Sequence, residues 1–276
     1  MLSTRDVKQK IRTVRSIQQI CRAMKTVASI RLRRAEQRLN AARPYREQIA
    51  GLAARVAAIT QEHPFLEKRL VKRTGLVVIT SDRGLAGGYN ASVIRQALRT
   101  ATPEQAVVIP VGRRGQAQLG SRGYTLVDGV PILGGEPEVA TVWRLAGELG
   151  EKYVRGELDQ VVLVYTRSLG GTRSRVTSEV ILPVEAQAEV GGEAIFEPSP
   201  ARLLAGLMDR YLCSQVLGAV LEASASEHGA RVAAMTLATD NAEEMVRSLT
   251  LAYNKARQAN ITREISEIVG AREATA

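Results

Sequence analysis

The residues best suited to phosphate chemistry lie in one glycine-rich stretch, Ser81–Asn90 (SDRGLAGGYN). It follows an apolar run typical of a buried strand and precedes a helical pattern, the place where many α/β proteins bind phosphate. It has neither the GxGxxG spacing nor the lysine and hydroxyl of a GxxxxGK[ST] loop. We therefore predict a tight strand-to-helix turn that needs glycine for its backbone angles, with Asp82 in a structural role and no bound cofactor.

No other set of residues has the spacing of a catalytic or metal site. The stretch Gly112–Gly115 (GRRG) could hold an anion at a helix start, but a surface turn explains it better. Cys21 and Cys213 lack a CxxC partner, which is typical of a reducing compartment, and His63 and His228 are too few for a zinc site. We predict packing roles for these residues, free thiols, no metal and no catalytic residue.

Basic residues are concentrated near the N-terminus. Residues 1–75 hold 18 Lys and Arg against 5 Asp and Glu, whereas the remainder holds 20 against 23. The cluster comprises Arg12, Arg15, Arg22, Lys25, Arg31, Arg33 and Arg34. Such a patch indicates an acidic partner, which could be nucleic acid, lipid or protein. Interleaved aromatic residues and a known nucleic-acid reader are missing, and an acidic protein loop explains the patch as well.

Two long helices must carry much of the chain. The first, predicted over 1–62, has a seam with alternating steps of four and three residues, a coiled-coil pattern. The seam residues are Val7, Ile11, Val14, Gln18, Cys21, Lys25, Ala28, Leu32, Ala35, Leu39 and Ala42, followed by Ile49, Leu52, Val56 and Ile59. Pro44 should kink this helix or open one hydrogen bond. Its length of roughly 80–90 Å, at about 1.5 Å per residue, exceeds what a small globular domain needs.

The second helix is predicted over 199–276, with Ser199 as N-cap and Pro200 at the first helical position. Its predicted seam consists of Met235, Ala238, Ala242, Met245, Leu249, Ala252, Ala256 and Ala259. Heptads at both ends of one chain predict an antiparallel coiled coil. The first helix also has a second apolar row, Ile17, Ile20, Met24 and Val27, which one partner helix cannot cover. Either a surrounding sleeve or self-association would cover it.

The middle of the chain, 74–196, is predicted to be a Rossmann-like α/β domain. Apolar β-branched runs at 76–81, 106–111 and 161–166 alternate with helical stretches near 91–100, which Asn90 would cap, and near 138–155. A further strand at 175–182 is expected, antiparallel at an edge, and 191–200 is expected to be a loop. The predicted fold class is thus α/β, a central Rossmann-like domain with a long antiparallel coiled coil. No run of about 18 apolar residues predicts a membrane-spanning helix, and the N-terminus lacks a signal-peptide pattern.

The chain resembles the gamma subunit of bacterial F-type ATP synthases nearly end to end. The residues that carry the resemblance are Ile17–Leu39 with Ala42-Arg43-Pro44-Tyr45, the stretch Ser81–Asn90, and the segments Arg231–Ala242 and Leu251–Ile268. The resemblance implies a rotor shaft whose coiled coil lies inside a barrel of alpha and beta subunits. The α/β domain would lie against the epsilon subunit and the c-subunit ring.

The resemblance further implies that the chain is not itself an enzyme. Rotation of the c ring would change the nucleotide affinity of the beta subunits, at the cytoplasmic face of the bacterial cell membrane, where the chain would be a peripheral subunit that does not insert into the membrane. Two other hypotheses are a basic coiled-coil adaptor for nucleic acid or anionic lipid, and a nucleotide-dependent enzyme that uses the middle domain.

By position, the resemblance assigns partner contacts. The lower contacts to the barrel are Met24, Lys25, Arg33 and Arg34; the upper contacts to a beta subunit are Arg257, Gln258, Thr262 and Glu264; Tyr211 lies near the c ring. Two residues depart from the family pattern: Arg263 replaces an expected glutamine, and Cys213 replaces a carboxylate found in many relatives.

Overall fold

The computed structural model describes residues 4–60, 63–127, 139–185 and 199–273. The chain divides into two compact units. Unit 1 consists of Met1–Val27 with Val232–Ala276, and unit 2 of Ala28–Arg231. These units divide both long helices, so they differ from the predicted domains 1–62, 74–196 and 199–276, whose boundaries remain a prediction.

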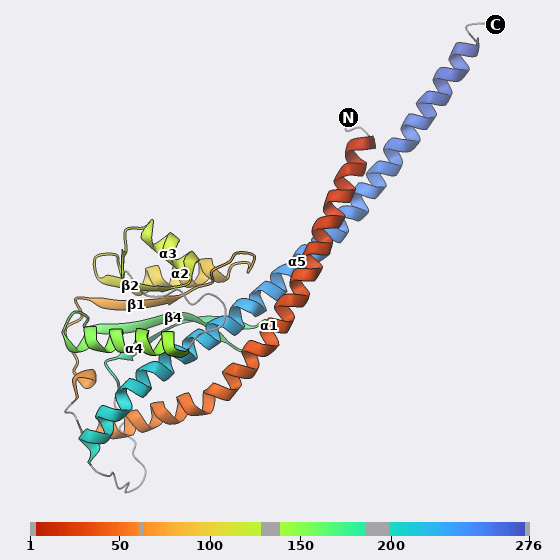
Figure 1. The fold of residues 1–276 in the computed structure, drawn as a ribbon. Helices are drawn as coiled ribbons and strands as arrows, with labels where there is room; N and C mark the ends of the chain where they lie inside the picture. The colour runs from red at the N-terminus through yellow and green to blue at the C-terminus, as the bar shows by residue number, and fades with distance from the viewer. Residues whose placement is uncertain (1–3, 61–62, 128–138, 186–198, 274–276) are drawn as a thin grey trace. The chain divides into compact units, whose positions relative to one another are not determined.

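Two long helices are confirmed. Helix α1 extends over Thr4–Ile59, 56 residues, and continues through Pro44; helix α5 extends over Pro200–Glu273, 74 residues (Figure 1). The side-chain oxygen of Ser199 accepts a hydrogen bond from the backbone N–H of Arg202 at 3.4 Å, as expected of an N-cap. Propensity alone does not hold helices of this length, so burial of an apolar stripe must stabilise them.

In unit 1 the seam of α1 is confirmed, because Val7, Ile11 and Cys21 are buried. The predicted seam of α5 is partly wrong: Met245, Ala252 and Ala259 are exposed, whereas Met235, Ala238, Ala242, Leu249 and Ala256 are buried or half-buried as predicted, and so are Thr239, Val246 and Tyr253. At Met245 and Ala252 the next residue along the helix, Val246 or Tyr253, is the less exposed one. Two adjacent rows both have coiled-coil spacing, so periodicity alone does not determine which of them is covered.

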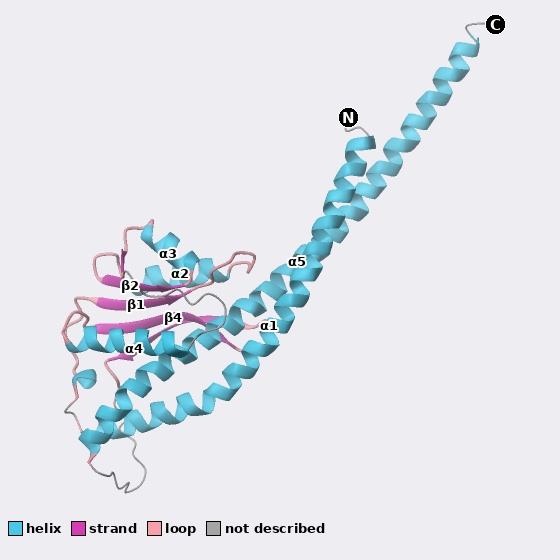
Figure 2. Ribbon diagram, viewed as in Figure 1, coloured by secondary structure: helices cyan, strands magenta, loops and turns pink. Residues whose placement is uncertain are grey.

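Unit 2 contains a five-stranded sheet in the order β3-β2-β1-β4-β5 (Figure 2). Its strands are β1 Thr74–Ile79, β2 Ala106–Val111, β3 Thr125–Leu126, β4 Gln160–Ser168 and β5 Ser174–Leu182. All neighbours pair in parallel except β5, which is antiparallel to β4 at the edge, as predicted.

Helices cover both faces of this sheet (Figure 1). Leu76 and Val78 of β1 pack toward α2 (Tyr89–Thr100) and α3 (Arg113–Gly120). The alternate residues Val77 and Ile79 pack toward α4 (Val139–Val154) and the helix α5. Because side chains alternate across a strand, one apolar run supplies both layers. A short turn of helix, η1 (Pro64–Leu66), adds buried Phe65 to the second layer.

Three local expectations need correction or fall outside the described residues. The stretch 112–115 is not a surface turn, because Gly112, with φ of 103°, begins helix α3. Ile59 is exposed rather than part of the seam, and Ala53 and Ala57 are buried instead. Most of the loop expected at 191–200 lies outside the described residues.

Candidate partner-binding surfaces and internal joints

The second apolar row of α1 lies exposed in unit 1. The side chains of Ile17, Ile20 and Val27 are 48%, 58% and 50% exposed, and Met24 is half-buried. Neighbouring apolar residues on one helix face form a patch that favours contact with another protein surface. The structure thus confirms that α5 does not cover this row.

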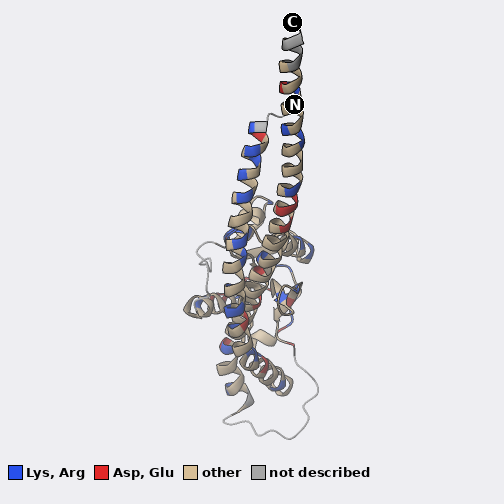
Figure 3. Ribbon diagram, turned by 90° about the vertical axis from the view of Figure 1, so that its right-hand side faces the viewer, with Lys and Arg blue, Asp and Glu red and all other residues tan. Residues whose placement is uncertain are grey.

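Basic side chains flank the apolar row. Arg12, Arg15 and Arg22 are exposed, and Figure 3 shows Lys and Arg repeated along the N-terminal part of α1. Arg22 approaches Glu243 of α5 at 3.8 Å, but both side chains are well exposed, so this ion pair contributes little to stability. Lys25, a predicted seam position, is half-buried. The exposed positive charge of Arg12, Arg15 and Arg22 could therefore attract an acidic partner.

The end of α5 extends beyond α1. From the Arg22–Glu243 pair, equal steps along two antiparallel helices place Thr4 level with about residue 261, so α5 continues alone from there (Figure 1). Arg257 and Gln258 lie just before this point and Thr262 and Glu264 beyond it, and all four are exposed. The nearby side chains of Ile261, Ile265 and Ile268 are 45%, 56% and 69% exposed. A single helix with this many exposed isoleucines has an apolar surface to bury.

The remaining predicted contacts belong to unit 2, so the structure does not gather the lower contacts in one unit. Arg33 and Arg34 are exposed on α1. Tyr211 is half-buried on α5, and burial raises its pKa to about 12. Cys213 is buried against the core, and desolvation raises the pKa of its thiol to about 11. Cys213, one of the two residues that depart from the family pattern, therefore faces the core.

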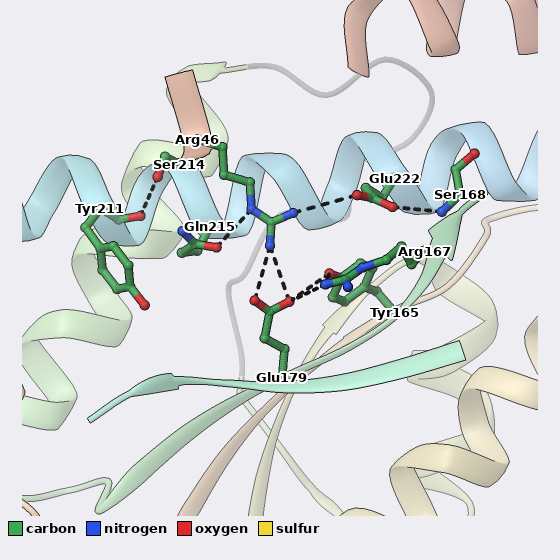
Figure 4. Close-up of polar contacts among 9 residues, drawn as sticks. All are labelled: Arg46, Tyr165, Arg167, Ser168, Glu179, Tyr211, Ser214, Gln215 and Glu222. Atoms are coloured by element: carbon green, nitrogen blue, oxygen red, sulfur yellow. Dashed lines mark hydrogen bonds and ion pairs between the residues drawn. The ribbon is translucent and has the colours of Figure 1, made fainter. Parts of the chain in front are cut away.

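A partly buried ionic cluster, which we call the Arg46 clamp, joins α1 to α5 and β5 (Figure 4). The Nε of Arg46 donates to Gln215 at 2.9 Å, and its Nη2 donates to both carboxylate oxygens of Glu179 at 3.4 and 3.3 Å. Its Nη1 lies 3.8 Å from an oxygen of Glu222. One side chain thus links three elements from distant parts of the sequence.

Each carboxylate of the clamp has a further partner on β4. Glu222 accepts a hydrogen bond from the backbone N–H of Ser168 at 2.7 Å, and Glu179 accepts from the hydroxyl of Tyr165 at 2.8 Å. Arg167 also approaches Glu179 at 3.2 Å, so two guanidinium groups balance two carboxylates. Burial and the negative Glu179 raise the pKa of Tyr165, which keeps its hydroxyl a donor. Compensation of this kind is what makes buried charges tolerable.

The sequence analysis missed this clamp, although one signal was present. Gln215 and Glu222 are seven residues apart in the predicted helix, so two polar side chains recur on one face that is otherwise apolar. Arg46 can approach because residue 218 is glycine: an added Cβ would lie 2.5 Å from the Cδ of Arg46.

The glycine turn, residues 81–90, is held by its own polar groups. Asn90 accepts a hydrogen bond from the backbone N–H of Ser81 at 3.0 Å, and Gly88 is the N-cap of α2. Asn90 is therefore not the cap that the sequence predicted, because its side chain closes the turn instead. Asp82 accepts from the backbone N–H of Arg113 at 3.0 Å, which confirms its structural role. Leu85 and Gly87 have φ of 63° and 55°.

The same turn is joined to α5. Arg231 donates to the carbonyl oxygen of Gly84 at 3.2 Å and pairs with Glu227 at 2.7 Å. The hydroxyl of Tyr89 donates to the carbonyl oxygen of Ala223 at 3.2 Å. His228 lies beside Arg231, and burial together with the positive charge lowers its pKa to about 4. The polar groups of the turn thus hold the sheet to a helix.

A third contact holds the β4–β5 connection against the parts of the long helices α1 and α5 that belong to unit 2. Glu36 of α1 accepts a hydrogen bond from the backbone N–H of Gly171 at 2.7 Å. An added Cβ at Gly229 of α5 would lie 2.6 Å from the carbonyl oxygen of Gly171, so only glycine permits this approach. Ser226 donates to the carbonyl oxygen of Thr166 at 2.9 Å. The sheet is therefore fastened to α5 at several points.

Chemistry-bearing clusters are few in the described part of the chain. Within it, no group of three or more His, Cys, Asp or Glu residues could hold a metal ion. None of the described helices is long and apolar enough to cross a membrane. Cys21 and Cys213 are both free, as predicted.

The comparisons agree with one another. A family model described as ATP synthase matches residues 3–275. The ATP synthase gamma chain of Moorella thermoacetica is 43% identical over 280 residues, with 99% of each chain covered. That of Brevibacillus brevis is 40% identical over 282 residues, covering 99% of this chain and 98% of the relative.

Solved structures show the same fold. A chain of the Euglena gracilis mitochondrial ATP synthase, from a structure of OSCP, F1 and c-ring, has a TM-score of 0.70 at 19% identity, covering 99% of this chain and 94% of that one. A chain of the Tetrahymena thermophila enzyme, from a structure of the central stalk and c ring, has a TM-score of 0.59 at 24% identity. The latter match covers 79% of this chain and 99% of that one. On the sequence matches, which extend over nearly the whole chain, this protein belongs to the ATP synthase gamma chain family.

Proposed function

We propose that the chain, as the gamma subunit of an F-type ATP synthase, is the rotating shaft that couples ion-driven rotation of the c ring to conformational change in the catalytic beta subunits. The observation that carries this proposal is the surface of unit 1. A helical pair there exposes an apolar row and the basic side chains of Arg12, Arg15 and Arg22, which suit a surrounding protein sleeve with acidic loops. No observation favours the nucleic-acid or lipid adaptor.

Asymmetry provides the mechanism. The exposed apolar row of Ile17, Ile20 and Val27 lies on α1, whereas α5 contributes acidic residues, Asp240, Glu243 and Glu244, together with basic ones, Arg247 and Lys255, in unit 1. A shaft with different faces contacts each of three catalytic sites differently at any moment. As it turns, each site meets the faces in sequence, and the differential contact free energy changes its nucleotide affinity.

The chain itself contributes no catalytic group in this proposal. Its glycine turn lacks the phosphate-binding lysine, and Ser81, Asp82 and Asn90 already bond within the turn or to α3. ATP synthesis from ADP and phosphate belongs to the assembled complex. The chain is then a peripheral subunit at the cytoplasmic face of the bacterial membrane.

We propose a partner for each of the predicted contact residues, and the exposure of its side chain indicates the kind of contact it makes. Arg257, Gln258, Thr262 and Glu264 would meet a beta subunit near the free end of α5. Met24, Lys25, Arg33 and Arg34 would meet the lower barrel loops. Tyr211 would lie toward the c ring or the epsilon subunit, where its half-buried ring suits a packing contact more than an ionic one.

Ile20 offers the sharpest test, because it is exposed in the chain and would be buried in the sleeve. Ile20→Lys should leave the fold of the chain intact but place a charge in an apolar contact. The expected result is continued ATP hydrolysis with reduced ATP-driven ion uptake, measured in the same membrane vesicles that contain the reassembled complex. Ile20→Leu is the matched control and should keep the ratio of uptake to hydrolysis. An unchanged ratio in Ile20→Lys would refute the sleeve contact.

A further inference from the structure

A cavity of about 200 Å³ lies in unit 2 among α1, α4 and α5. Its apolar wall includes Leu39, Leu217, Val139 and Trp143. Trp143 and Val139 are 43% and 52% exposed, which places them at the mouth of the cavity. A cavity of about 150 Å³ with apolar walls is known to hold benzene, so this one has room for one ring or a short acyl chain.

The polar lining of this cavity is mainly positive. Arg43 and Arg210 are exposed lining residues, and within the described residues neither takes part in an ion pair. Arg46 and Glu222 also line it, but Glu222 is compensated by Arg46 and by the N–H of Ser168. The 3.8 Å distance between Arg46 Nη1 and Glu222 is that of an ion pair and is too long for a hydrogen bond.

We propose that this cavity binds a small amphipathic carboxylate. Its apolar body would lie against Trp143, Leu39 and Leu217, and its carboxylate would meet Arg43 and Arg210. An apolar wall with a few convergent polar groups is the usual composition of a small-molecule site. Guanidinium groups are the side chains best matched to a carboxylate, since they donate two parallel hydrogen bonds. A neutral apolar molecule would make no ionic contact with Arg43 and Arg210, and a large lipid would exceed the volume of the cavity.

Binding in the cavity can be followed by tryptophan fluorescence, because Trp143, which lines the cavity, is the single tryptophan of the chain. Octanoate, titrated into the purified full chain, should shift the Trp143 emission to shorter wavelength in a saturable way, since the ligand removes water from a half-exposed indole. Bound ligand should also raise the melting temperature, because it stabilises only the folded chain. 3-Phenylpropionate, run in parallel, distinguishes an aromatic body from a linear acyl chain, and saturable binding of either acid supports the site.

Variants separate the carboxylate contact from simple apolar binding. Arg43→Gln with Arg210→Gln should raise the octanoate Kd by about tenfold, which corresponds to about 1.4 kcal/mol. The same double variant should leave the weaker binding of 1-octanol unchanged. Both side chains are exposed, so folding should not change, and circular dichroism verifies this.

Cysteine chemistry gives an independent measurement, since Cys213 lines the cavity and Cys21 belongs to unit 1. Octanoate should slow the alkylation of Cys213 by N-ethylmaleimide and leave the rate at Cys21 unchanged, as read from the masses of the two labelled peptides. The absence of saturable Trp143 change with both acids, or an octanoate Kd that the arginine variants do not alter, would overturn the proposal. Equal protection of both cysteines would also contradict it.

Discussion

Replacing Gly218 by alanine has two opposite effects on the free energy of unfolding. In a helix interior alanine is favoured over glycine by up to about 1 kcal/mol, because glycine loses more backbone entropy on folding. Against this, the new Cβ would lie 2.5 Å from the Cδ and 2.9 Å from the Nε of Arg46. These distances are too short, so Arg46 must move away from α5.

The movement breaks the Arg46 clamp. Hydrogen bonds to charged groups are worth about 1.5–3 kcal/mol, and Arg46 makes such bonds to Glu179 and a further one to Gln215. The side chain of Glu222, only 8% exposed, would lose its ionic partner, which adds to the loss. One lost bond already exceeds the helix gain. We expect a net destabilisation of about 1–2 kcal/mol, a fall in melting temperature of roughly 2–6 °C for a chain of this size.

Thermal unfolding of the purified chain measures this, with two matched controls. Gly206→Ala lies in the same helix with nothing within 4 Å of the new Cβ, so it should raise the melting temperature by a few degrees. In an Arg46→Ala background the clash is absent, so Gly218→Ala should become stabilising. If Gly218→Ala raises the melting temperature of the native chain as Gly206→Ala does, the clamp does not hold Arg46 in place.

Three further outcomes are expected. Because His228 has a pKa of about 4 when folded and about 6.5 when unfolded, the unfolded chain binds more protons between these values, so stability should decrease as the pH is lowered from about 6.5 to 4. The free energy of unfolding in urea is measured at pH 7 and pH 5 for the native chain and for His228→Gln, both of which keep Glu227. His228→Gln should reduce the difference between the two pH values, and an equal difference in both chains would contradict the assignment. Gly112→Ala, at φ of 103° and with a Cβ 2.2 Å from the carbonyl oxygen of Thr80, should destabilise by more than about 3 kcal/mol, seen as a large loss of melting temperature. Arg33→Ala should leave ion uptake per ATP hydrolysed within about twofold, since one exposed ion pair is worth at most about 1 kcal/mol; loss of coupling would show that Arg33 acts alone.

Features with a local cause were predictable from the sequence. The α1 seam from Val7 to Leu39 follows from periodicity alone, and the strands β1, β2 and β4 follow from apolar β-branched runs. The edge position of β5 was also predictable. The prediction for the seam of α5 was wrong at Met245, Ala252 and Ala259, because periodicity predicts the spacing of a stripe but does not distinguish adjacent rows with the same spacing.

Features that depend on distant residues were not predictable. The partners Arg46 and Gln215 are 169 positions apart, and nothing in the local pattern of either names the other. Asn90 looked like an N-cap because its type and position fit, but Ser81 competes for its side chain. The two-residue strand β3 is too short to leave a periodic signal.

The glycine turn shows why a motif that looks like a phosphate loop need not bind phosphate. Its carbonyl at Gly84 accepts from Arg231, 147 positions away, so two of the segments that carry the family resemblance contact one another. A mobile loop would deform under load, whereas hydrogen bonds from Arg231 and Tyr89 and the capping bond of Asp82 fix this turn to α5 and α3. In a shaft, a joint between the sheet and α5 must transmit force without yielding. The residues of the turn are therefore better explained by stiffness than by ligand chemistry, and their polar groups are already used within the chain.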